Sequence, residues 1–172
     1  METCGYNDCL DSNICYNHSI YYCLFWFEIM VNQQLTKHFN LNEFAVSSDN
    51  PELARNIKFS DVEIERIRFI CAAYLEPMRK YFDMPINISS GKRSRELNNA
   101  IRGSSPNSHH MYIGNNSAVD IWIEGICALE ISNWLLTSVI TRKIIAYTHR
   151  NFVHISFPNG DGIYNHLEVK YE

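Results

Sequence analysis

The sequence predicts an α+β domain in which helices pack on a small antiparallel sheet. The clearest helical periodicity lies between residues 60 and 76, whereas most segments with strand-like alternation come after residue 118. Helices and strands that are separated along the chain in this way favour an α+β fold over an alternating α/β fold. The chain has 172 residues, of which 46% are hydrophobic and 20% charged. It is therefore long and apolar enough for one domain with its own core.

A capping box marks the start of the clearest helix, because Ser60 can cap it and Glu63 follows three residues later. Apolar side chains then recur at helical spacing, at Ile64, Ile67, Ile70, Cys71, Tyr74 and Leu75. Pro77 is expected to bend or end this helix near Leu75, since proline cannot donate the next backbone hydrogen bond. The preceding residues, 36–59, predict a short helix and a loop.

The remaining elements are predicted from strand-forming residues, helical patterns and turn residues. Strands are expected at 84–88, 118–123, 142–146 and 152–157, helices at 95–101 and 126–137, a long loop at 103–117, and a turn at 158–162 that leads into a terminal segment. Cys71 and Cys127 both have apolar neighbours, so we expect both thiols to be buried.

The first 29 residues differ in composition from the rest, so we divide the chain into an extension, 1–29, and a domain, 30–172. Four cysteines lie in this extension: Cys4, Cys9, Cys15 and Cys23. Their spacing matches no CxxC zinc pattern, which leaves disulfides and metal binding both open. Met30 could be the true start of translation; alternatively, the extension packs its aromatic residues on the domain.

Charge and hydropathy exclude some classes of partner. The net charge is −4 and the isoelectric point is near 6.0, so we expect no binding to nucleic acid. The apolar run at 20–27 is shorter than the roughly 20 residues of a membrane span, so none is expected. No lysine or arginine precedes Lys37, which argues against a secretory signal. We expect a monomer.

Three polar residues in otherwise apolar or turn-rich surroundings are candidate metal ligands. His110 ends a loop segment, Asp120 lies inside the apolar strand 118–121, and His154 lies inside the strand 152–156. A buried charge is costly unless it is paired or bound to a metal. Catalytic zinc sites typically use three protein ligands and keep one position for water. From the residues alone, an ion-paired aspartate and a hydrogen-bonded core histidine are alternative interpretations.

A family resemblance favours the metal interpretation. Five stretches in order resemble the zinc D-Ala-D-Ala carboxypeptidase family, which includes phage endolysin peptidases: Leu35–Phe44, Leu75–Arg79, Ile88–Ser94 with Leu97, Asn98 and Ala100, then Ser108–His110 with Ala118–Ile121, and Phe152–Ser156. Together they span about 120 residues of the sequence. The resemblance implies a fold like that of hedgehog and D-Ala-D-Ala peptidases, and a peptidoglycan peptide as the substrate.

Carried over by position, the resemblance implies that one zinc ion is bound by His110, Asp120 and His154. His109 would be the exposed neighbour of the first ligand, although the two adjacent histidines could exchange roles. Arg93 would bind a substrate carboxylate or carbonyl, which suits its fork of donors. Ser108 would bind substrate or cap the loop. In a zinc site, the three ligand atoms should converge to within about 4 Å of one another.

The sequence departs from the family pattern twice. Nine residues separate His110 from Asp120, more than the family has, and a surface loop can absorb the extra length at low cost. The family's glutamate, the general base, is missing from residues 142–151. Tyr147 or His149 falls in its place; imidazole can act as a base near neutral pH, whereas Tyr147 could donate a hydrogen bond.

These observations predict a zinc metallopeptidase that acts on peptidoglycan stem peptides, as a D-Ala-D-Ala carboxypeptidase or an endolysin-type endopeptidase. The alternative is an impaired zinc-binding module that recognises the cell wall, because the glutamate is absent. A third class is a structural zinc protein that uses the N-terminal cysteines. A peptidase without its own signal is expected to be encoded by a phage or virus and to act on the bacterial cell wall.

Overall fold

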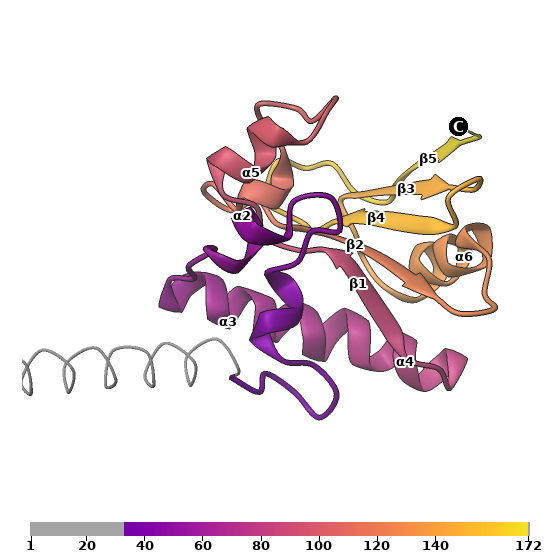
Figure 1. The fold of residues 1–172 in the computed structure, drawn as a ribbon. Coiled ribbons are helices and arrows are strands. Elements are labelled where there is room, and N and C mark those ends of the chain that lie inside the picture. The colour runs from indigo at the N-terminus through magenta and orange to yellow at the C-terminus, as the bar shows by residue number, and fades with distance from the viewer. Residues whose placement is uncertain (1–32, 172) are drawn as a thin grey trace, which may run out of the picture. The chain divides into compact units, whose positions relative to one another are not determined.

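The computed structural model describes residues 33–171 and has the predicted α+β fold (Figure 1). A five-stranded sheet has the order β1-β2-β4-β3-β5. Its strands are β1 (Ile86–Ser90), β2 (Ala118–Ile123), β3 (Lys143–Tyr147), β4 (Phe152–Ser156) and β5 (His166–Lys170). The predictions for residues 1–29, including those for their cysteines, lie outside the described residues.

The sheet is mixed, which corrects the purely antiparallel arrangement expected from the sequence. The pairs β1–β2, β2–β4 and β3–β4 are antiparallel, but β5 runs parallel to β3. The chain leaves the end of β4 and returns to the beginning of β3, where the amide of Asn165 donates to the carbonyl of Thr141 at 2.7 Å. Since β5 starts beside the first residue of β3, the two strands must run in the same direction.

A long helical segment runs beside the sheet as α3 (Asp61–Ile70) and α4 (Glu76–Phe82). Its start is the predicted capping box, in which Glu63 accepts from the Ser60 amide at 2.8 Å. Of the two expected effects, a bend or an end, Pro77 does not produce the second, because the helical segment continues through it as α4. A π-helical turn, Cys71–Leu75, precedes it. We infer that this wider turn takes up the missing N–H and the bulk of the proline ring.

Shorter helices complete the domain. They are the 3-10 turns Leu41–Phe44 and His109–Met111 and the α-helices α2 (Pro51–Arg55), α5 (Arg95–Ala100) and α6 (Ala128–Ser138). The predicted helix 126–137 begins two residues later, at Ala128. Cys127 is the exposed residue just before it, which corrects the expectation of a buried thiol, whereas Cys71 is buried as expected. Within residues 33–171, no helix combines the length and apolar character that a membrane crossing requires.

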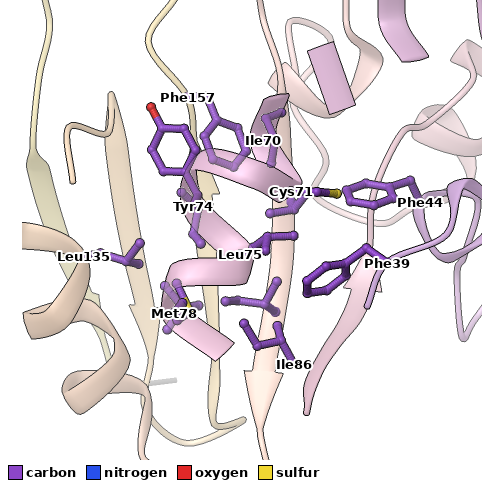
Figure 2. Close-up of a cluster of buried hydrophobic side chains, with 14 of the residues drawn as sticks. Phe39, Phe44, Ile70, Cys71, Tyr74, Leu75, Met78, Ile86, Leu135 and Phe157 are labelled. Carbon is purple, nitrogen blue, oxygen red and sulfur yellow. The ribbon is translucent and has the colours of Figure 1, made fainter. Parts of the chain in front are cut away.

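The two faces of the sheet have different roles. Val119, Ile121 and Ile123 alternate on the face of β2 that joins the core, where they are fully buried. Helix residues including Ile70, Leu75, Met78 and Leu135 pack in the same cluster (Figure 2). Asp120 and Trp122 therefore point to the opposite face, since successive side chains of a strand alternate. This opposite face carries the polar residues of the candidate site.

Candidate metal centre

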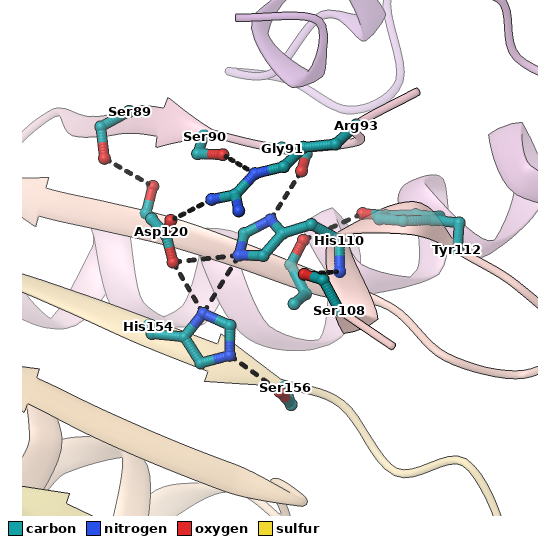
Figure 3. A network of polar contacts seen from close by, with 11 residues as sticks. Ser89, Ser90, Gly91, Arg93, Ser108, His110, Tyr112, Asp120, His154 and Ser156 are labelled. Atoms are coloured by element: carbon teal, nitrogen blue, oxygen red, sulfur yellow. Dashed lines mark hydrogen bonds and ion pairs between the residues drawn. The ribbon is translucent and has the colours of Figure 1, made fainter. Parts of the chain in front are cut away.

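The three predicted ligands come from three segments that the fold brings together (Figure 3). Asp120 and His154 are direct cross-strand partners on β2 and β4. His110 belongs to the 3-10 turn before β2, which Ser108 caps through its hydroxyl. The long connection to β2 is anchored by Tyr112, whose ring is 4% exposed. The longer loop therefore leaves the position of His110 intact.

The ligand atoms converge as expected for a metal site. His110 Nε2 lies 3.2 Å from Asp120 Oδ1 and 3.1 Å from His154 Nδ1, and His154 Nδ1 lies 2.7 Å from Asp120 Oδ1. These separations meet the expected limit of about 4 Å. His110 and Asp120 are buried, at 2% and 8% exposure.

Each imidazole is oriented by a second partner. The Nδ1 atom of His110 lies 2.7 Å from the carbonyl of Gly91, so this nitrogen carries the proton and donates it. His154 Nε2 lies 2.9 Å from the hydroxyl of Ser156. Outer partners of this kind fix the rotation and tautomer of metal-binding histidines. The lone pair of His110 Nε2 is consequently directed at Asp120 and His154.

The electrostatics direct two electron-rich atoms of the cluster at one another. Burial lowers the pKa of His110, so its ring is neutral at neutral pH. Burial alone would raise the pKa of Asp120, but the neighbouring His110 and His154 lower it well below its usual range. A carboxylate oxygen and a histidine lone pair thus face each other in a buried place.

A divalent cation would resolve this arrangement. Two imidazole nitrogens and one carboxylate oxygen are the donor set of many catalytic zinc sites. The free lone pair of His110 and the inner oxygen of the ionised Asp120 converge on the same small region, where an ion bound by His110, Asp120 and His154 would accept electron pairs from all three. The residues present therefore fit zinc.

Arg93 lies beside the cluster and contacts it directly. Its Nη2 donates to Asp120 Oδ2 at 3.1 Å, and its Nε donates to the hydroxyl of Ser90 at 3.0 Å. Burial lowers the pKa of Arg93, which the nearby Asp120 and Tyr147 partly offset. Arg93 thus orients the outer oxygen of Asp120 in this structure. Its predicted contact with substrate stays a prediction.

A cavity of about 240 Å³ opens next to Asp120 on the same side of the sheet. Its lining includes Arg93, Trp122, Arg150, Phe152 and Asp49. Sequence reasoning missed the last four of these. Trp122 and Phe152 could have been found, because each is two residues from a predicted ligand and two is the repeat of a strand face.

The two residues considered as replacements for the missing glutamate lie in different settings. Tyr147 ends β3, and its ring stacks on Phe152 with centroids 4.3 Å apart. His149 is exposed in the following turn. The cross-strand partner of His154 is Ile145, so Tyr147 lies two residues beyond that row on the same strand, and His149 lies four residues beyond it, in the turn. A catalytic group must reach the reacting atoms directly or through one water, which favours Tyr147, as a hydrogen-bond donor, over His149.

The domain is α+β, and its His-Asp-His cluster lies on the face of the sheet opposite the core. This combination is typical of a mononuclear metallohydrolase. A family model described as Peptidase M15 matches residues 37–156, which include all three cluster residues. The chain therefore belongs to the peptidase M15 family, which confirms the resemblance noted in its sequence. Searches of curated proteins and of solved structures gave no match.

Proposed function

We propose that the protein is a zinc-dependent peptidase that cleaves peptidoglycan stem peptides. The observation that carries the proposal is the convergence of His110, Asp120 and His154 within 2.7–3.2 Å of one another, beside an open cavity. Membership of the peptidase M15 family supports hydrolysis of a peptide. Peptidoglycan as the substrate rests on the sequence resemblance to D-Ala-D-Ala carboxypeptidases and endolysins.

Each residue of the site has a task in this chemistry. When bound, zinc activates water as a nucleophile and polarises the carbonyl that the water attacks. Gly91 and Ser156 hold the rings of His110 and His154 in place. Arg93 holds the outer oxygen of Asp120, which leaves the inner oxygen directed at the two histidines. Tyr147, on the same sheet face, would donate a hydrogen bond to the oxygen that becomes negative during attack.

The direct test is to measure metal content and hydrolysis together on the full chain. We expect about one zinc per chain, cleavage of purified peptidoglycan with release of new amino groups or D-alanine, and loss of cleavage on chelation that added zinc reverses. Zinc-free protein at neutral pH would disprove the metal assignment. A zinc-loaded chain that cleaves no stem peptide would disprove the enzymatic part alone.

Variants of the two candidate replacements for the glutamate test the role of Tyr147. Tyr147→Phe removes only the hydroxyl, and we expect kcat to fall about 10- to 100-fold because a donor to a charged oxygen is lost. His149→Ala should leave kcat within about twofold, since its ring lies too far along the turn. Steady-state kinetics on the same substrate compares them. A large loss in His149→Ala with none in Tyr147→Phe would reverse the assignment.

A zinc-binding module that recognises the cell wall without cleaving it is the second candidate. It is favoured by one observation: no glutamate lines the cavity, and Asp49 is its one carboxylate besides Asp120. Asp49 is exposed on the loop before α2. Binding to peptidoglycan with full zinc content and no product would establish this alternative.

A further inference from the structure

The side chain of Arg150 lines the cavity beside the metal cluster and has no role in the proposed chemistry. Arg150 lies in the turn between β3 and β4, and its guanidinium carbon is 5.0 Å from the centre of the Phe152 ring. Trp122 lines the same cavity and is 38% exposed. Two aromatic rings and one arginine thus form its wall next to Asp120. We call Arg150, Phe152 and Trp122 the arginine wall.

Arg150 differs from Arg93, the other arginine of the cavity. Arg93 is 12% exposed and already donates to Asp120 and Ser90. Arg150 is exposed, and within residues 33–171 no acidic side chain forms an ion pair with it. When a guanidinium stacks on an aromatic ring, the contact holds its flat face. The N–H groups at the edge of the guanidinium can still donate hydrogen bonds to another partner. Arg150 is therefore the arginine that can accept a new anionic partner.

The position of Arg150 relative to the cluster suits a peptide. Phe152 is two residues before His154 on β4, which corresponds to about 7 Å along the strand. The Arg150 guanidinium lies over Phe152. A peptide spans about 3.3–3.6 Å per residue. A carboxylate bound by Arg150 would thus lie one or two residues from a peptide bond held at the cluster.

We propose that the arginine wall is the subsite for the terminal carboxylate of the substrate peptide, with Phe152 holding the Arg150 guanidinium, Arg150 binding the carboxylate and Trp122 packing against the terminal residue. This proposal rests on the proposed peptidase function and deepens it. Arg93, predicted from the sequence to bind a substrate carboxylate or carbonyl, donates to Asp120 and Ser90 in this structure. The planar fork of Arg150 can bind both carboxylate oxygens at once.

The experiment compares two probes that differ only in the terminal group: an acylated stem-peptide fragment that ends in D-Ala-D-Ala carboxylate, and the same peptide as its C-terminal amide. Binding to the zinc-loaded full chain is measured by calorimetry, and hydrolysis is measured in parallel. We expect the wild-type chain to bind the acid about 10- to 100-fold more tightly than the amide, as charged hydrogen bonds imply. Arg150→Gln should remove this preference while zinc content stays at one per chain.

Two further variants make the result specific. Arg150→Lys keeps the charge without the planar fork and should recover part of the preference. Arg102→Gln removes an exposed arginine that is not part of the cavity lining and should change neither affinity. The proposal is overturned if the wild-type chain binds acid and amide equally, or if Arg150→Gln keeps the preference. If binding follows the prediction but neither peptide is cleaved, the subsite stands and the proposed peptidase activity falls.

Discussion

Asp120→Asn is expected to lower the zinc affinity by more than about 100-fold and to reduce hydrolysis to background. The side chain keeps its shape, so Arg93 can still donate to it, but it loses the negative charge that faces both histidines. Loss of an outer partner of a metal ligand already costs about 10- to 100-fold in affinity. Loss of a ligand's charge should therefore cost more. Zinc titration against a competing chelator measures the affinity directly.

Asp161→Asn is the matched control for this change. Asp161 also pairs with an arginine, Arg142, at 2.6 Å, but it is exposed and is not one of the three cluster residues. The same substitution there should leave zinc affinity and hydrolysis unchanged. If both variants bound zinc as tightly as the wild-type chain, Asp120 would be an ion-pair partner of Arg93 and not a metal ligand.

Gly91→Ala should produce the largest loss of stability among the single changes considered. A Cβ at residue 91 would meet the Cα of Phe44 at 2.6 Å and its carbonyl carbon at 2.8 Å. Backbone atoms cannot move aside as a flexible side chain can. The Lys92 amide fixes that segment further by donating to the Phe44 carbonyl at 2.8 Å. We expect a cost of about 1–3 kcal/mol, and thus a thermal midpoint lower by about 2–12 °C.

The same change should weaken zinc binding, because the Gly91 carbonyl orients His110. Gly103→Ala is the control, since Gly103 has a positive φ of 77° but open space where a Cβ would lie. Backbone strain alone should cost it about 1 kcal/mol and leave zinc binding unchanged. Equal thermal midpoints and equal zinc affinities in the two variants would show that the approach of residue 91 to Phe44 is unimportant.

The site has three residues that can bind a metal, but no glutamate lines the cavity beside them. Asp120 and His154 are fixed by the register of β2 and β4. The residue opposite Phe152 in β3 is Tyr147, a donor without a negative charge. The kinetics of Tyr147→Phe and the measurement of hydrolysis itself therefore bear on the enzyme, whereas zinc titration bears on the cluster.

Local patterns in the sequence determined the elements and the ligands. The alternation in 118–123 gives β2 and directs Asp120 away from the core, and the capping box at Ser60 starts α3. Both depend on neighbours within a few residues, so a single sequence is sufficient to predict them. The order of the family's motifs added the choice of His110 over His109, and the structure brings His110 to the cluster.

Contacts between distant segments were decided only by the tertiary structure. The π-helical turn carries the helix past Pro77, and the return of the chain to Thr141 makes β5 parallel to β3. The partnership of Arg93 with Asp120 joins side chains 27 residues apart, and the arginine wall joins Trp122 to Arg150, 28 residues later. No local pattern encodes such pairs, since they form only when strand register and packing place the segments side by side. The sequence thus named the candidate ligands, and the fold decided what surrounds them.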